Sequence, residues 1–428
     1  MTKPMTKPMT LAEKIIARAA GAAAVRAGDI VTCRVDLAMM HDSGGPRRVK
    51  PMLERLGAGV WDPDKVVVVS DHYVPAVDPE SAAILDLTRK WVKAEGVARF
   101  HDMQGICHVV LPERGHLRPG MFAVGGDSHS PTGGAFGAFM VGIGATEMLG
   151  VLVQGTIWIK VPQTILVEWT GRLGPGVGAK DVMLFLCRHL GMKAASYRAV
   201  QFTGAAVAAL PMAERMTLCN MAAELGAKTG LIAPDATTAA FLREAGVPGE
   251  PDLAAWQGDP DAVVEAHHVW DAGALPPQVA APHSPANSGP VGEHAGVRID
   301  QAYIGACTGA KLEDLAMAAA VLKGRRTAPG VRLLIAPASQ RIMSRAAADG
   351  TLAALTEAGA ILLPSGCGAC AGYGAGVLAE EEVCISSTAR NFQGRMGAHS
   401  ARVYLGSPYT VAAAAVAGRI VDPREMLP

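Results

Sequence analysis

Apolar and polar positions alternate with two periods along this chain. Three segments have apolar residues at helical spacing, and three short runs are rich in β-branched residues. The predicted helices cover residues 13–26, 81–96 and 180–191, and the predicted strands cover 30–35, 66–70 and 163–169. Because strands and helices alternate, the pattern predicts α/β units with parallel sheets and helices on their faces.

The alternation is most regular in the C-terminal third. Strands are predicted at 301–305, 331–336 and 360–363, and helices at 312–324 and 339–349. Residues 246–296 are instead rich in proline, alanine and histidine, which indicates a connection between domains. In open α/β sheets, ligands bind beyond the carboxyl ends of the strands, so functional residues are expected there.

The chain is longer than one hydrophobic core usually serves. Its 428 residues indicate several packed domains. We expect a disordered tail over 1–10, a first α/β domain over 11–163, a second over 164–290 that ends in the proline-rich linker, and a third over 291–428.

Composition and charge narrow the function classes. Half of the residues are hydrophobic and 18% are charged, and 39 basic residues balance 39 acidic ones. Zero net charge argues against a nucleic-acid partner. No secretion signal and no run of about 18 apolar residues is visible, so we expect a cytoplasmic protein without a membrane span. In a reducing compartment, clustered cysteines indicate metal ligation or catalysis.

Three of the eight cysteines follow predicted strand ends. Cys307 lies in YIGACTGA, and Cys367 and Cys370 form a C-x-x-C in PSGCGACAG. We expect both segments to leave neighbouring parallel strands at one edge, with small neighbours leaving room for an inorganic group. Structural zinc sites and electron-transfer clusters take four protein ligands, so three indicate a catalytic centre with an open position. On this motif alone, a redox pair or a chance spacing stays open; Cys384, in an apolar run, is expected to be buried filler.

Histidines paired with acids follow apolar runs in the N-terminal half. Asp71 and His72 lie in SDHYVPA, His108 in QGICHVVLPE, and Asp127, Ser128 and His129 in GGDSHSPTGG. A single histidine near a strand end is usually structural, and we read His101, His116 and His189 in that way. A carboxylate beside an imidazole orients it and raises its basicity, as acid–base chemistry requires.

Two further polar segments are candidates. Asn220 and Glu224 are four residues apart, which on a helix places them on one face. Arg390 and Arg395 lie in a glycine-containing loop and could bind carboxylates through two nitrogens each. A polar helix stripe and a surface salt-bridge face are the structural alternatives.

Taken together, the motifs resemble a known family. The following occur in order: GICHVVLPE, GGDSHSPTGGAFGAFMVGIGATEM, LCNMAAELGA, PHSPANSGPVGE, GACTG, GCGAC, RNFQGRMG and YLGSPYTVAAAAVAGRIVDP. This series is similar to the large subunit of 3-isopropylmalate dehydratase, within the aconitase superfamily, from about residue 11 to the C-terminus. The resemblance implies three α/β/α domains around a [4Fe-4S] cluster and a role in leucine biosynthesis.

The resemblance also implies roles for the residues named above. Cys307, Cys367 and Cys370 would hold three irons, and the fourth iron would bind substrate. Residues implied to act in catalysis are Asp71, His72, His108, Asp127, His129 and Glu224, and those implied to bind substrate are Ser128, Asn220, Arg390 and Arg395.

Two departures concern the surroundings of the cluster. The family usually reads S-C-T-N at the first cysteine, where this chain ends the motif with Gly309, and N-R-N-F where it has Ala389. Loss of such amides typically alters the affinity or potential of a metal site. HDSGGP also differs from the usual stretch in leucine-pathway enzymes, so a hydratase of methylmalate, dimethylmalate (dimethylmaleate) or homoaconitate is the alternative to 3-isopropylmalate.

The resemblance finally implies a partner. In the superfamily the base is a serine in a G-S-S-R-E motif of a separate swivel domain, and these 428 residues contain no such motif. We therefore expect a small subunit of about 150–200 residues that supplies this serine in a heterodimer or heterotetramer. A non-enzymatic iron–sulfur regulator and a structural zinc protein are the rival classes; neutral charge argues against RNA binding by the former.

Overall fold

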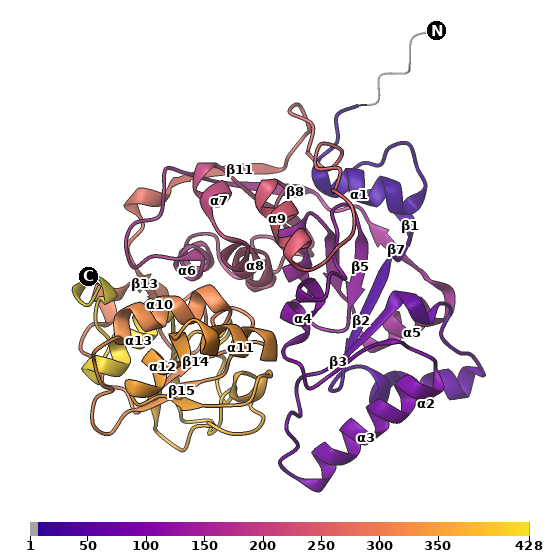
Figure 1. Ribbon diagram of the computed structural model, residues 1–428. Coiled ribbons are helices and arrows are strands. Elements are labelled where there is room, and N and C mark those ends of the chain that lie inside the picture. The colour runs from indigo at the N-terminus through magenta and orange to yellow at the C-terminus, as the bar shows by residue number, and fades with distance from the viewer. Residues whose placement is uncertain (1–6, 428) are drawn as a thin grey trace.

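The computed structural model describes residues 7–427 and contains three α/β/α domains, each built on a mostly parallel sheet (Figure 1). In Figure 1 the first is indigo to purple, the second runs magenta across the top, and the third is orange to yellow. None of the helices in the described part of the chain is long and apolar enough to cross a membrane.

The first domain is a five-stranded, fully parallel sheet with helices around it. Its strands, in spatial order, are β4 (Arg99–Asp102), β3 (Val66–Ser70), β2 (Leu37–His41), β5 (Phe122–Gly125) and β6 (Phe139–Gly142). Its helices are α1 (Leu11–Ala20), α2 (Pro46–Leu56), α3 (Pro79–Ala94), α4 (Cys107–Glu113) and α5 (Ala145–Gln154). All residues of β2 and β3 are buried, because both faces of the sheet are covered.

The start of the chain differs from expectation in two ways. Residues 1–6 of the predicted tail lie outside the described residues, but Met9 donates to Asp259 at 2.7 Å and Thr10 is buried. Thr10 and Glu13 form a capping box that begins α1. The helix ends at Ala20 rather than residue 26, because Gly21 adopts a left-handed conformation with φ 65°.

The second domain carries a four-stranded parallel sheet. Its strands, in spatial order, are β10 (Thr229–Leu231), β9 (Ala199–Thr203), β8 (Thr164–Thr170) and β11 (Ala266–Asp271). Its helices are α6 (Ala179–His189), α7 (Ala205–Ala209), α8 (Met212–Met221) and α9 (Ala236–Glu244). A separate antiparallel pair, β1 (Ile30–Arg34) and β7 (Thr156–Lys160), lies outside these sheets.

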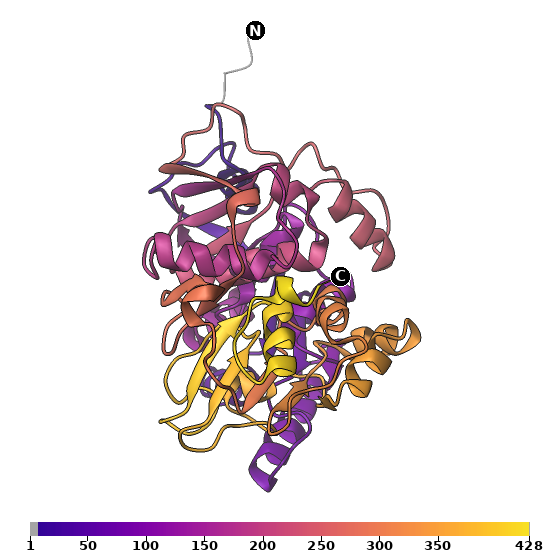
Figure 2. The ribbon, with the colours of Figure 1, turned by 90° about the vertical axis from the view of Figure 1, so that its left-hand side faces the viewer.

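The third domain has a seven-stranded mixed sheet (Figure 2). Its strands, in spatial order, are β13 (Ser288–Pro290), β12 (Gln278–Ala280), β18 (Arg402–Gly406), β17 (Val383–Ser386), β14 (Gln301–Ile304), β15 (Arg332–Ile335) and β16 (Ile361–Leu362). Its helices are α10 (Leu312–Leu322), α11 (Gln340–Ala348), α12 (Thr351–Glu357) and α13 (Pro408–Ala417).

Residues 246–296, expected to connect two domains, also contribute strands: β11 joins the second sheet, and β12 and β13 join the third, before residue 291. One expectation about the cysteines is wrong. The two cysteine segments do not leave neighbouring strands, because β15 lies between β14 and β16. Both segments still reach the same edge, since β14, β15 and β16 are parallel.

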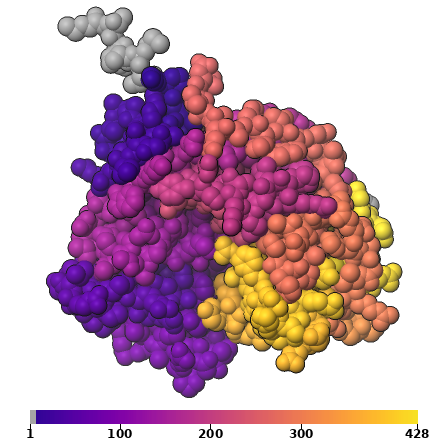
Figure 3. Space-filling view, turned by 180° about the vertical axis from the view of Figure 1, so that it is seen from behind, coloured from indigo at the N-terminus to yellow at the C-terminus, as the bar shows by residue number. Residues whose placement is uncertain are grey.

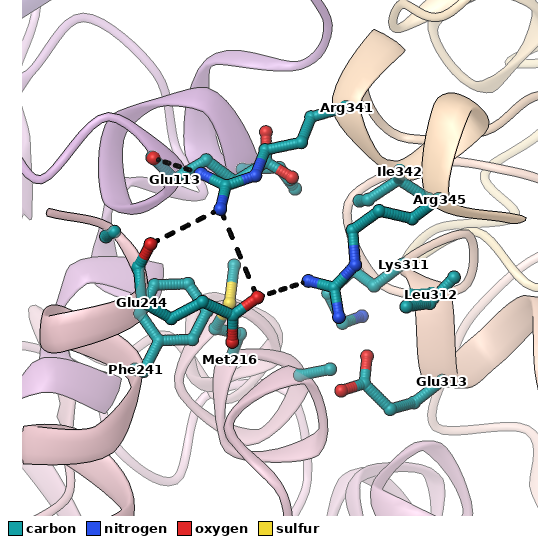
Figure 4. Close-up of a pocket in the computed structure, with 13 residues that line it drawn as sticks. Glu113, Met216, Phe241, Glu244, Lys311, Leu312, Glu313, Arg341, Ile342 and Arg345 are labelled. Carbon is teal, nitrogen blue, oxygen red and sulfur yellow. Dashed lines mark hydrogen bonds and ion pairs between the residues drawn. The ribbon is translucent and has the colours of Figure 1, made fainter. Parts of the chain in front are cut away.

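The three domains pack closely against one another, as the space-filling view in Figure 3 shows. Hydrogen bonds and ion pairs contribute to this packing at the junction drawn in Figure 4. Arg341 Nη1 donates to the backbone oxygen of Glu113 at 3.0 Å, and Arg345 Nη1 contacts Glu244 Oε1 at 2.6 Å. These contacts join α4, α9 and α11, one helix from each domain.

The junction between the first two domains predicts a strict requirement for glycine at position 134. A Cβ there would lie 1.6 Å from the backbone oxygen of Gly230 on β10. We expect Gly134→Ala to lower the free energy of unfolding by about 1–3 kcal/mol, the usual range for overpacking. Gly150→Ala is the matched control, since its Cβ meets nothing within 4 Å. Equal urea midpoints for both variants would contradict the close packing of these domains.

Candidate active site

One cavity of about 300 Å³ collects polar side chains from strand ends of the first and third domains. The first domain contributes His41 at the end of β2, Asp71 and His72 after β3, and residues 127–129 after β5. The third domain contributes the segments after β14, β16 and β17. The predicted site residues that line it are Asp71, His72, His108, Asp127, Ser128, His129, Cys307, Cys367, Cys370, Arg390 and Arg395. Asn220 and Glu224 lie just behind this lining and contact it through hydrogen bonds.

Asp71 and His72 form a buried ion pair. His72 Nδ1 donates to Asp71 Oδ1 at 2.7 Å, and the His72 backbone amide donates to Asp42 at 3.1 Å. Burial acts to lower the pKa of His72, but the charge of Asp71 and hydrogen bonds to Asp42 and Asp71 raise it well above 6.5. His72 is therefore an imidazolium at neutral pH, and with Nδ1 engaged it has Nε2 left to donate.

A second group of charges surrounds Asp127. Its Oδ1 accepts from His108 Nε2 at 2.8 Å and from the His129 backbone amide at 2.7 Å. Burial acts to raise the pKa of Asp127, but the charge and hydrogen bond of His108 hold it well below 3.8. This carboxylate therefore stays ionised and fixes the orientation of the His108 ring.

Glu224 joins all three domains at one carboxylate oxygen. Its Oε1 lies 3.1 Å from His129 Nε2 and 2.8 Å from Arg390 Nε. Arg390 Nη1 also donates to Ser128 Oγ at 2.9 Å. The sequence placed Glu224 and Asn220 on one helix; in the structure α8 ends at Met221 and Glu224 lies on a following 3₁₀ turn, 222–225.

The three predicted thiols line the same wall of the cavity. A hydrogen bond from the Cys367 thiol lowers the pKa of Cys370 to about 5, whereas burial raises that of Cys307 to about 12. Asn220 Nδ2 donates to Cys307 Sγ at 3.1 Å. Among the described residues, the three sulfurs do not form a group whose ligand atoms all lie within 4.8 Å of one another. Arg395 Nε is buried without a hydrogen-bond partner among these residues, so it can donate to a bound carboxylate.

The sequence analysis assigned no role to several residues in or beside the cavity. His41 stacks on the His72 ring at 4.2 Å, and Asp42, fully buried, holds the backbone of His72. Both residues belong to the stretch HDSGGP, which begins at the last residue of β2. The sequence pattern did not predict this strand. Cys107 also lines the cavity, and its amide donates to Asp71 Oδ2 at 2.7 Å. Cys384 is fully buried on β17, as expected.

The departure at residue 309 has a steric explanation. A Cβ at Gly309 would lie 2.2 Å from Ser387 Oγ. That hydroxyl accepts from the Gly305 amide at 3.0 Å and contacts the Gly309 carbonyl at 3.3 Å. Ser387 therefore occupies the space that an asparagine side chain would need, and it braces both ends of the Cys307 turn.

The fold and the cavity together define the class of protein: an α/β protein with thiols, histidine–carboxylate pairs and arginines around one cavity. The sequence matches the aconitase family (aconitate hydratase) over residues 13–296 and 290–418. This chain belongs to the aconitase family and is a hydro-lyase.

Curated relatives cover nearly the whole chain. The 3-isopropylmalate dehydratase large subunit 1 of Methanopyrus kandleri is 47% identical over 420 residues, which cover 98% of this chain and 99% of that protein. The probable methanogen homoaconitase large subunit of Methanosarcina mazei is 46% identical, over 92% of this chain and 99% of that protein. Among solved structures, aconitase X of Thermococcus kodakaraensis in its holo-form shares the fold, with a TM-score of 0.53 and 13% identity over 86% of this chain and 88% of that chain.

The environment of Asp127 predicts a pH-dependent loss of stability in Asp127→Asn. Because the folded pKa lies well below 3.8, the carboxylate contributes stability above that value and loses it as the pH falls through the folded pKa. We expect a deficit of about 1.5–3 kcal/mol at pH 7, the range for hydrogen bonds to charged groups. Urea unfolding at pH 7, 5 and 3.5 would show the deficit beginning to shrink at the lowest pH. A deficit independent of pH would show that packing, rather than charge, is lost.

Proposed function

We propose that this chain is the cluster-binding large subunit of a [4Fe-4S] dehydratase that isomerises a branched hydroxy-dicarboxylic acid, namely isopropylmalate. The observation that carries the proposal is the single cavity lined by three thiols, histidine–carboxylate pairs and two arginines. Cys307, Cys367 and Cys370 would hold the cluster. When bound, it supplies a Lewis acid for the substrate hydroxyl through the iron that no cysteine holds.

The arginines bind the carboxylates of the substrate. Arg390 is oriented by Glu224 and Ser128, which fix its guanidinium at the cavity wall. Arg395 has an unpartnered Nε beside the thiols. Two guanidinium groups in a partly enclosed cavity favour a dianion, and they stabilise the negative charge that grows on a carboxylate as the neighbouring C–H bond breaks.

The histidine–carboxylate pairs transfer protons. His72 is protonated at neutral pH and faces the cavity, so it can donate a proton from Nε2 to the departing hydroxyl. Asp71 and Asp42 hold the imidazolium in place through Nδ1 and the backbone amide. His108 and His129, fixed by Asp127 and Glu224, orient the substrate oxygens in the same cavity.

A small subunit completes the reaction in this proposal. The base that removes the carbon-bound proton is a serine on that partner, as the family resemblance implies. The relatives from Methanopyrus kandleri and Methanosarcina mazei are both named large subunits, which supports a two-subunit assembly. The same two names point to different substrates. One relative is an isopropylmalate enzyme and the other a homoaconitase, and their sequence identities to this chain are nearly equal.

The ligand assignment predicts different behaviour for two buried cysteines. Cys367→Ser is expected to abolish the visible absorbance and the iron and sulfide content of anaerobically purified protein, because it removes one of three iron ligands. Cys384→Ser is the matched control, since Cys384 is fully buried and lies outside the cavity lining. Unchanged iron and sulfide in Cys367→Ser would overturn the assignment, and zinc in the parent protein would replace the cluster proposal altogether.

The partner and substrate can be tested in one assay. The chain alone is expected to show cluster absorbance without turnover, and turnover is expected after anaerobic mixing with the small subunit encoded beside it. The panel is 3-isopropylmalate, methylmalate, 2,3-dimethylmalate and homocitrate-type acids, compared by kcat/KM. Robust activity without the small subunit would contradict the partner, and a preference of tenfold or more for another acid would replace isopropylmalate as the substrate.

A further inference from the structure

Lys180 is a buried cation that the reaction proposed above does not use. It lies in the first turn of α6 in the second domain and is 1% exposed. Its Nζ donates to the backbone oxygens of Ser387 (3.3 Å) and Thr388, which belong to the third domain. Among residues 7–427, the other buried lysine, Lys311, has Asp314 as an ion-pair partner at 2.7 Å, whereas the ammonium of Lys180 contacts carbonyl oxygens.

The segment that Lys180 holds connects two parts of the active site. Ser387 braces the Cys307 turn through its hydroxyl, and its carbonyl accepts from Thr308 Oγ1 at 2.9 Å. Thr388 Oγ1 donates to the backbone oxygen of Arg390 at 3.2 Å. A single ammonium from the second domain therefore anchors the backbone of residues 387 and 388. The hydrogen bonds of these two residues reach the Cys307 turn on one side and Arg390 on the other.

A buried cation without a carboxylate partner is destabilising unless its hydrogen bonds offset the desolvation. Burial lowers the pKa of Lys180 to about 8, so the charged form of the side chain depends on the carbonyl oxygens of Ser387 and Thr388 that it contacts.

We infer that Lys180 is a positioning residue: its ammonium fixes the 387–390 backbone, which carries Arg390 and supports the Cys307 turn. The expected effect on iron retention rests on the proposed function, since it concerns the cluster. The backbone role concerns this chain alone.

The test compares Lys180→Met with Arg215→Met in the full-length, anaerobically purified chain. Arg215 is a matched control because it is a fully buried cation of the same domain that donates to a backbone carbonyl (Leu210, 3.0 Å) and pairs with Asp235 (2.7 Å), both within the second domain. By hydrogen-exchange mass spectrometry, Lys180→Met is expected to speed amide exchange over residues 387–392 at least tenfold. Arg215→Met is expected to leave that segment unchanged and to speed exchange around residues 208–238.

A second readout concerns the metal group. Lys180→Met is expected to lose visible absorbance to an iron chelator at least threefold faster than the parent chain, because the Cys307 turn loses part of its support. Lys180→Gln, which keeps a hydrogen-bond donor without the charge, is expected to restore most of the exchange protection and of the iron retention. Lys180→Leu replaces Lys180→Met if the methionine variant fails to fold.

The two readouts separate the inference from the proposed function. Unchanged exchange over 387–392 in Lys180→Met would overturn the positioning role whether or not the chain holds iron. Faster exchange with unchanged iron loss would overturn the support that this segment gives to the Cys307 turn. Absence of iron from the parent chain would contradict the proposed function, while the exchange result would still decide the backbone role.

Discussion

The arrangement of the site depends on the hydrogen bonds that buried Asp71 accepts. Its Oδ1 accepts from His72, its Oδ2 accepts from the Cys107 amide at the start of α4, and its backbone oxygen accepts from the Cys367 amide at 2.7 Å. One fully buried residue thus joins His72, the helix that carries His108 and the C-x-x-C turn. A buried carboxylate without partners would be strongly destabilising, so the carboxylate holds His72 and the start of α4 in place, while the backbone oxygen holds the C-x-x-C turn.

The sequence predicted the features that depend on local pattern. Runs such as 66–70 read as buried parallel strands because both faces of such a sheet are covered, and polar residues directly after those runs identified Asp71, His72 and Asp127. The resemblance added the order of the motifs, and the family match bears out the family and the fold class. The domain limits and residue roles that the resemblance implies stay predictions.

What the sequence could not predict depends on long-range packing. β2 contains a histidine and two methionines and follows β1 closely, so its apolar run merged with that strand, and His41 and Asp42 went unnoticed. β12 and β13 are each three residues long in a proline-rich stretch, too short for a period to show. The pairing of β12 with β18, and of β13 with β12, defines them. The reason for Gly309 likewise emerges only when Ser387, far away in sequence, is seen to fill its space.

The distribution of charge over three domains explains why the site and the domain packing form together. Glu224 of the second domain finds its partners in His129 of the first and Arg390 of the third. Lys180 of the second domain likewise donates to the third. If the domains separated, Glu224 and Lys180 would lose these partners. Burying either charge without a partner costs several kcal/mol. Closure of the three domains is therefore favourable only in the arrangement that also aligns Arg390, His129 and the thiols around one cavity.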